Sequence, residues 1–196
     1  EKRTVVASMG AIAASGGYYA AVAADKIMAN PGTITGSIGV IVEFVNAQEL
    51  LGKIGLKGYV VKSGKYKDVG SPLREMEKEE RELLQTLIND VNGQFIKAVA
   101  EGRNLKTEEV RRIADGRIFT GAQAKELKLV DELGGLSDAI ALSASLAGIE
   151  GEPAVIYPER QKMSIWKTFS GGASIESLTE LFTGLRVSYM IQNPAR

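Results

Sequence analysis

The 196-residue sequence predicts an α/β domain in which strands alternate with helices. Short runs of small and β-branched apolar residues are typical of buried strands, and segments with apolar residues at helical spacing follow them. Glycine and proline separate the two kinds of segment. Alternation of this kind is typical of domains built from βα units.

The first half of the chain predicts a strand and a helix joined at a serine, then further short elements. The apolar run over 3–15 predicts one buried strand, and GGYYAAVAA, residues 16–24, predicts the helix after it. Residues 26–44 predict short strands interrupted by a Pro-Gly pair and by two further glycines. A helix is expected over 46–55 and a strand over 57–64.

A polar loop over 65–72 precedes a long predicted helix. Pro72 is expected to open this helix, because proline is favoured in the first helical turn. Leucine, isoleucine, valine and phenylalanine recur at helical spacing up to about Ala100, which indicates an amphipathic helix.

The next segment predicts three shorter helices. They are expected over 106–115 with Thr107 as N-cap, over 120–130 with Thr120 as N-cap, and over 135–148.

A composition change near Pro158 predicts two regions, a domain over residues 1–158 and a C-terminal helix and extended tail over residues 159–196. A short strand over 152–158 ends the first region. The second contains an amphipathic helix over 173–185, followed by RVSYMIQNPAR.

Composition excludes several kinds of chemistry. The chain has no histidine and no cysteine, and 24 Lys and Arg balance 24 Asp and Glu. Ser-His-Asp triads, thiol catalysis, disulfides and the usual zinc sites are therefore excluded within this chain. We expect no cofactor and no metal, and the charge balance argues against general nucleic-acid binding. The chain opens on Glu1 without a methionine and enters a predicted strand at once, so we expect a fragment of a longer protein, and a membrane anchor upstream would lie outside it. It lacks an apolar run of about 18 residues, so none of it is expected to span a membrane.

Ser15 is the first candidate nucleophile. It stands in Ala13-Ala14-Ser15-Gly16-Gly17, a relaxed form of the G-x-S-x-G pattern that raises a serine on a strand-to-helix turn. A tight turn that happens to contain a serine is the equally weighted alternative.

Two other serines compete with it. Ser37, in TITGSIGV, has β-branched neighbours that favour a strand residue. Ser164 begins an S-x-x-K match, which we attribute to chance because the accompanying S-D-N and K-T-G patterns are missing.

Without histidine, the base for a serine nucleophile must be a neutral lysine amine. A lysine in water has a pKa of about 10.4, so burial would have to lower it. Lys65 and Lys67 flank Tyr66 in a loop after a predicted strand, where α/β enzymes carry active-site groups. A solvated loop is the alternative, and the pattern does not separate Lys65 from Lys67.

The chain contains three blocks in this order: AASGGYYAAVAADKIMANPGTITGSIGVI, SGKYKDVGSP and DGRIFTGAQAKELKLVDELGG. Together they resemble the signal peptide peptidase A (SppA) family of serine proteases in its short bacterial form. The resemblance runs from about Val5 to Leu136. It implies a caseinolytic protease/crotonase-like fold of ββα units, with the N-terminal part missing from this chain.

The same resemblance implies a Ser/Lys dyad. Ser15 corresponds to the nucleophile and Lys67 to the general base, while Ser37 corresponds to a serine that hydrogen-bonds the lysine amine. The N–H of Gly16 would form part of the oxyanion hole, and the second donor would lie upstream of this chain.

The implied function is that of a serine endopeptidase degrading remnant signal peptides at the bacterial cell membrane, with an extracytoplasmic catalytic domain. Its partners would be apolar peptides bound as extended strands and further copies in a dome-like homo-oligomer such as an octamer. Two alternatives are a non-catalytic scaffold of the same fold and a crotonase-like acyl-CoA enzyme. The second is disfavoured because such enzymes rely on carboxylates rather than on a Ser/Lys dyad.

The tail adds one further hypothesis. Val187, Tyr189 and Ile191 alternate in a segment expected to be extended, which favours a peptide that enters the enzyme's own groove and is trimmed or retained there. A disordered terminus is the alternative.

Overall fold

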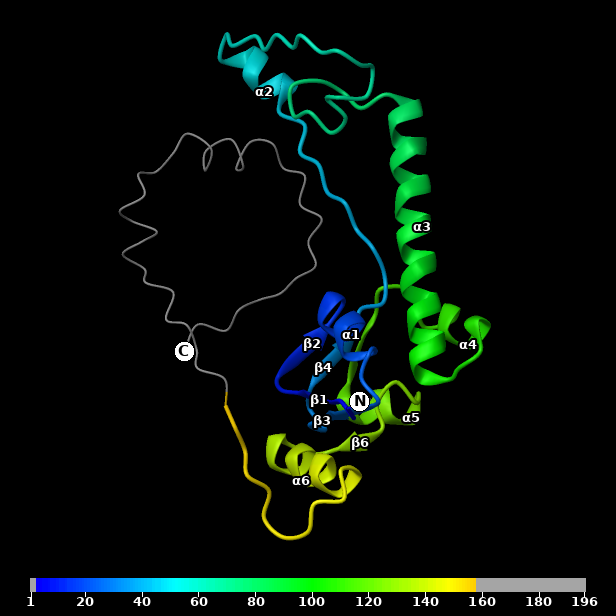
Figure 1. The fold of residues 1–196 in the computed structure, drawn as a ribbon. Helices are drawn as coiled ribbons and strands as arrows, with labels where there is room; N and C mark the ends of the chain where they lie inside the picture. The colour runs from blue at the N-terminus through cyan, green and yellow to red at the C-terminus, as the bar shows by residue number, and fades with distance from the viewer. Residues whose placement is uncertain (1–2, 158–196) are drawn as a thin grey trace, which may run out of the picture. The chain divides into compact units, whose positions relative to one another are not determined.

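The computed structural model describes residues 3–157, which divide into two compact units (Figure 1). The first unit comprises residues 3–40 and 88–155, and the second comprises residues 41–87 with 156–157. The predicted boundary after residue 158 therefore falls at the end of the described residues and stays a prediction. Ser164, the helix expected over 173–185 and the tail lie outside them.

The first unit contains two small three-stranded sheets. The first has the order β1-β3-β6 with parallel pairing, and the second has the order β2-β4-β5 with β5 antiparallel. The strands are β1 (Val6–Met9), β2 (Ile12–Ala14), β3 (Lys26–Ala29), β4 (Ile34–Gly36), β5 (Ile118–Thr120) and β6 (Glu132–Leu133). The mixed α/β class is confirmed.

Six helices lie within the described residues: α1 (Gly16–Ala21), α2 (Gln48–Lys53), α3 (Lys78–Arg103), α4 (Thr107–Arg111), α5 (Gly121–Glu126) and α6 (Leu136–Leu146). Thr120 is the N-cap of α5 as predicted, and its hydroxyl accepts a hydrogen bond from the Gln123 amide at 3.2 Å. The cap of α4 is Lys106, so the prediction of Thr107 was wrong by one residue.

The single strand predicted over 3–15 is two strands in two different sheets. β1 ends at Met9, and β2 begins at Ile12 beside β4. A residue from another segment stabilises the break between the two strands: the Thr33 hydroxyl donates a hydrogen bond of 2.6 Å to the carbonyl oxygen of Gly10. Thr33 itself is buried, so this bond is shielded from water.

The core of the first unit lies between its sheets and the C-terminal half of α3. The fully buried side chains include Tyr18, Ile27, Ile38, Val99, Val110 and Leu129. The Tyr19 ring meets the Phe95 ring edge to face, with centroids 5.0 Å apart. An added Cβ at Gly102 would lie 2.4 Å from the carbonyl oxygen of Val22, so only glycine allows α3 this close to the end of α1.

A partly buried carboxylate fixes β3 against the same helix. Asp131 accepts hydrogen bonds from the Ile27 amide at 2.7 Å and from Arg103 Nη1 at 2.8 Å. Burial alone would raise the pKa of Asp131, but these two bonds hold the pKa below its ordinary value. The carboxylate therefore stays ionised and keeps both bonds.

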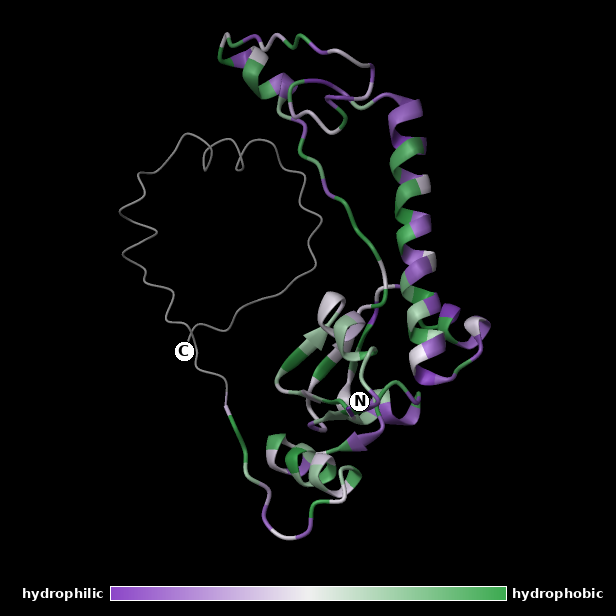
Figure 2. Cartoon of the chain, viewed as in Figure 1, coloured by the Kyte–Doolittle hydropathy of each residue, from purple (hydrophilic) through white to green (hydrophobic). Residues whose placement is uncertain are grey.

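The second unit departs from the predictions at two elements. Residues 57–64 form no strand, and Tyr59 and Val61 are 88% and 102% exposed. The long helix begins at Lys78 rather than at Pro72. Residues 72–77 are not helical, and Arg74 among them forms hydrogen bonds with Asp68 and Glu80. Figure 2 shows polar and apolar residues interleaved along α3, as expected for an amphipathic helix.

Three further differences are small. β5 and β6, of three and two residues, were not predicted, and residues 152–157 form no strand. Strands this short carry no pattern of their own, since two or three residues cannot display an alternation.

Candidate active site

Ser15 occupies the turn between β2 and α1. Its backbone has φ 51° and ψ −120°, in the left-handed half of the map where residues other than glycine are strained. The Ser15 amide donates to the Gly36 carbonyl at 2.8 Å, and its own carbonyl accepts from the Tyr19 amide at 2.8 Å. These two bonds hold the strained conformation in place from both sides.

The Ser15 hydroxyl is not used to start the helix. Ser15 is the N-cap of α1, yet within residues 3–157 its side chain makes no capping hydrogen bond. Serine at this position usually caps the helix with its hydroxyl oxygen. The backbone conformation instead leaves the oxygen for another partner, as in the strand-turn-helix arrangement of serine nucleophiles.

Gly16 and Tyr18 explain how the turn is positioned. Gly16 is the first residue of α1, so its amide hydrogen has no acceptor within the helix. Tyr18 is fully buried and donates a hydrogen bond of 2.8 Å from its hydroxyl to the Leu129 carbonyl. Burial raises the pKa of Tyr18, which keeps this donor protonated. The start of α1 is thus anchored to the core.

Ser37 lies beside Ser15 at the ends of two paired strands. β2 and β4 are parallel with Ala14 opposite Gly36, so the residue that follows each strand is a serine. Ser37 has φ 50°, and its amide donates to the Arg117 carbonyl at 2.8 Å. The expectation that Ser37 is a strand residue was wrong, because β4 ends one residue before it.

Gly36 permits this arrangement. It has φ +77°, and an added Cβ would lie 2.6 Å from the Phe119 ring and 3.1 Å from the Arg117 carbonyl oxygen. No side chain fits between β4 and β5 at this point. The sheet therefore reaches the two serines only because a glycine precedes Ser37.

Lys65 and Lys67 lie on a loop of the second unit and have different surroundings. Lys65 Nζ is ion-paired with Glu79 and lies 3.9 Å from Glu77 Oε2. The hydrogen bond to Glu79 raises the pKa of Lys65, which favours the protonated amine. Lys67 is exposed, so the burial expected of a lysine base is not found among the described residues, and no carboxylate in this part of the chain forms an ion pair with it.

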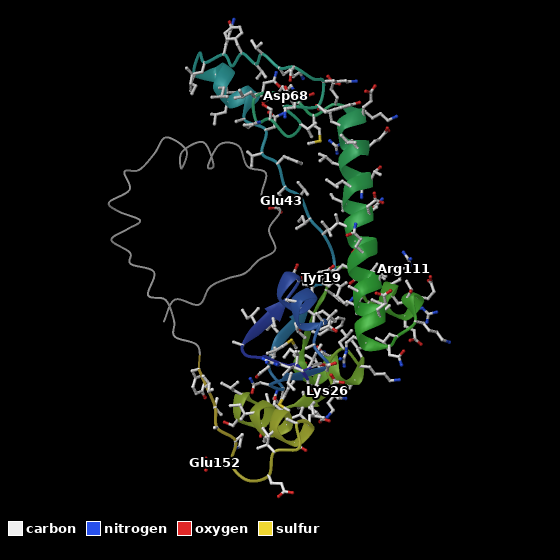
Figure 3. All side chains as sticks on the ribbon, in the orientation of Figure 1. Tyr19, Lys26, Glu43, Asp68, Arg111 and Glu152 are labelled. Carbon is white, nitrogen blue, oxygen red and sulfur yellow. The ribbon has the colours of Figure 1, made fainter. Side chains whose placement is uncertain are left out.

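The loop around Lys67 is closed by ion pairs that the sequence did not indicate. Asp68, labelled in Figure 3 between α2 and α3, is bound by Lys62 and Arg74, and Arg74 also binds Glu80. Hydrogen bonds from Arg74 and Lys62 hold the pKa of Asp68 well below its ordinary value. The Arg74 hydrogen bond lowers the pKa of Glu80 to about 2.

Glu80 was missed because it stands in the charge-rich stretch EMEKEERE, where a solvated helix face is the usual outcome. Its side chain is only 1% exposed. The one available signal is the spacing from Glu77 to Glu80, which is that of a capping box; Glu80 Oε2 accepts from the Glu77 amide at 2.9 Å.

The predicted site residues divide between the two units. Ser15, Gly16 and Ser37 belong to the first unit, where the sheet brings them together, and Lys67 belongs to the second. Residues 3–157 contain no group of three or more Asp or Glu side chains placed to hold a metal ion. None of the helices described is both long and apolar enough to cross a membrane.

Comparison with known proteins gives a consistent result. Residues 1–150 match the family model of Peptidase family S49. A Synechocystis sp. protein named "Putative protease" is 50% identical over 174 residues, which cover 89% of this chain and 63% of that protein. An Enterococcus faecium protein named "Putative signal peptide peptidase SppA" is 44% identical over 65% of this chain and 37% of its own length. "Protease 4" of Salmonella typhi is 36% identical over 76% of this chain and 24% of its own length.

Proposed function

Because the chain belongs to peptidase family S49, we propose that its full-length protein is a serine endopeptidase with Ser15 as nucleophile and Lys67 as general base. The chain spans 63% or less of the relatives described above, so this is a proposal about the protein as a whole. The observation that carries it is the backbone of Ser15, which is strained, held by two hydrogen bonds and does not use the hydroxyl as a cap.

The acylation step needs one proton acceptor and one oxyanion donor. The neutral Lys67 amine takes the hydroxyl proton as Ser15 Oγ forms a bond to the peptide carbonyl carbon. The carbonyl electron pair moves onto oxygen, where the Gly16 amide hydrogen can bind it. When the C–N bond breaks, the Lys67 ammonium gives its proton to the leaving amine, and an acyl-enzyme ester remains on Ser15.

Deacylation repeats the sequence with water. Lys67 takes a proton from a water molecule as the water oxygen bonds to the ester carbonyl carbon. The ester C–O bond then breaks, and the proton returns from Lys67 to Ser15 Oγ. The peptide acid is released and both side chains regain their starting protonation.

Ser37 has a role in this scheme that needs no charge. Its hydroxyl oxygen would accept a hydrogen bond from the Lys67 amine, which turns the nitrogen lone pair toward Ser15. A carboxylate at this position would instead favour the protonated amine. The register that places Ser37 beside Ser15 supports this assignment.

The contrast between the two lysines supports Lys67 over Lys65. A base has to lose its proton before it can accept one, and the ion pair with Glu79 works against that at Lys65. Lys67 forms no ion pair with a carboxylate within the described residues. We therefore assign the base to Lys67.

For the substrate we propose remnant signal peptides, bound as extended segments with apolar side chains. This rests on the family and on a relative whose name describes a signal peptide peptidase. On the same basis we place the protein at the bacterial cell membrane, with its catalytic part extracytoplasmic, and propose a homo-oligomer.

The test is covalent labelling of the full-length protein by a fluorophosphonate probe, with the labelled peptide identified by mass spectrometry. We expect labelling at Ser15 that is lost in Ser15→Ala and strongly slowed in Lys67→Ala. Labelling at another residue, or an equal rate in Lys67→Ala, would remove the dyad and leave the scaffold alternative.

A further inference from the structure

The residue after Lys67 accepts three side-chain hydrogen bonds from two cationic residues. Asp68 accepts two parallel hydrogen bonds from Arg74, from Nε to Oδ2 and from Nη2 to Oδ1, both of 2.9 Å. It also accepts one of 2.6 Å from Lys62 Nζ. The Asp68 side chain is 11% exposed, so these bonds are largely shielded from solvent. Bidentate pairing of this kind fixes direction as well as distance.

The same arginine binds the first turn of α3. Arg74 Nη1 donates to Glu80 Oε2 at 2.7 Å, and Nη2 is bonded to Glu80 Oε1. Glu80 Oε2 also accepts from the Glu77 amide. One guanidinium thus joins the loop that carries Lys67 to the start of a 26-residue helix.

The main chain around Lys67 is also held by local hydrogen bonds. The Lys67 amide donates to the Gly64 carbonyl at 3.2 Å, and the Ser71 amide donates to the Asp68 carbonyl at 3.0 Å. Lys62 Nζ, besides binding Asp68, donates to the Lys65 carbonyl at 2.9 Å. Residues on both sides of Lys67 are thus held by these bonds. The Lys67 amine itself takes no part in the ion pairs of Asp68 and Arg74.

We propose that Arg74 is a positioning residue for the general base, acting through Asp68 and Glu80. This rests on the proposed function, because it needs Lys67 to be the base. General-base transfer requires the amine within hydrogen-bond reach of the serine, and a displacement of about 1 Å can lower a rate by about a hundredfold. A base on a long, exposed side chain depends on a fixed backbone for that placement.

The test compares Arg74→Met and the milder Asp68→Asn in full-length protein with Lys67 or with Lys67→Ala. The measured quantity is the rate of Ser15 labelling by the fluorophosphonate probe. Both variants are expected to slow labelling about tenfold or more when Lys67 is present. In the Lys67→Ala background the same substitutions should change the remaining rate less than twofold, because no base is left to position.

Glu82→Gln is the matched control, since Glu82 lies on the same helix in an exposed pair with Lys78 and is expected to label at the wild-type rate. Trypsin cleavage after Lys67 gives a readout independent of catalysis, expected to be faster in Arg74→Met and unchanged in Glu82→Gln. Equal slowing in both Lys67 backgrounds would mean general damage to the fold and would overturn the proposal, as would wild-type labelling in Arg74→Met.

Failure of the proposed function has a different signature. If Lys67→Ala alone labels at the wild-type rate, the dyad is wrong and the positioning role falls with it. If Lys67→Ala is slow but Arg74→Met is not, the dyad stands and only the role of Arg74 is refuted.

Discussion

The Ser15 amide and the Gly36 carbonyl oxygen are joined by a hydrogen bond of 2.8 Å that ties the end of β2 to the end of β4. The bond fixes the strained serine to the residue immediately before Ser37. The sheet therefore positions the candidate nucleophile and Ser37. Substitutions in the sheet at this point are expected to change the position of both serines.

Gly36→Ala should destabilise the first unit. The new methyl group would clash with the Phe119 ring at a φ of +77°, a conformation that costs a non-glycine residue about 1–3 kcal/mol before the clash is counted. Denaturant unfolding measures the loss. Gly32→Ala is the control, because nothing lies within 4 Å of an added Cβ there; similar losses in both variants would contradict the steric argument.

Ser15→Gly and Ser15→Ala separate the role of the hydroxyl from that of the backbone. Both remove the oxygen, so both should abolish peptide cleavage. Glycine accepts φ 51° without strain and alanine does not, so Ser15→Gly should be more stable than Ser15→Ala by about 1 kcal/mol. Unfolding midpoints of the two inactive proteins test this, and a more stable alanine variant would show that the backbone is not strained.

Lys67→Ala and Lys65→Ala test the choice of base by kcat/KM on a fluorogenic apolar peptide. Loss of the general base should lower kcat/KM by about 10²–10⁴-fold, whereas loss of the ion-paired Lys65 should change it only a few-fold. Wild-type activity should rise toward alkaline pH, since only a neutral amine accepts a proton. Comparable losses in the two variants would remove the distinction drawn from the Glu79 pair.

Acid should weaken the second unit through the pair of Glu80 with Arg74. The pKa of Glu80 falls from 4.5 to about 2 in the folded protein, so the unfolded chain binds the proton first as pH drops. The stability from this pair is complete above pH 4.5 and disappears as pH falls toward about 2. Urea unfolding across this window should show a smaller loss in Glu80→Gln than in wild type, with Glu82→Gln resembling wild type.

The parts of the site that follow from local chemistry were predictable from the sequence. Small residues and the Gly-Gly pair after Ser15 indicate a sharp turn from strand to helix, which the structure contains. Thr120 and Gln123 have the spacing of a capping box and form one.

The parts that depend on distant partners were not predictable. An apolar run such as 3–15 does not reveal that its two halves pair with different strands. Residues 57–64 have the composition of a strand but, within the described residues, no neighbouring strand to pair with. Glu80 resembles its exposed neighbours until Arg74 is placed beside it.

The register between β2 and β4 limits how the length of this segment can change during evolution. One residue inserted into either strand would move Ser15 past Ser37 and send the following side chains to the opposite face. The turn at Pro31 and Gly32 is exposed but also bound, because the Pro31 carbonyl oxygen accepts a hydrogen bond of 3.1 Å from the Ala122 amide at the start of α5. Homologous chains are therefore expected to keep the length of the two strands that lead to the serines.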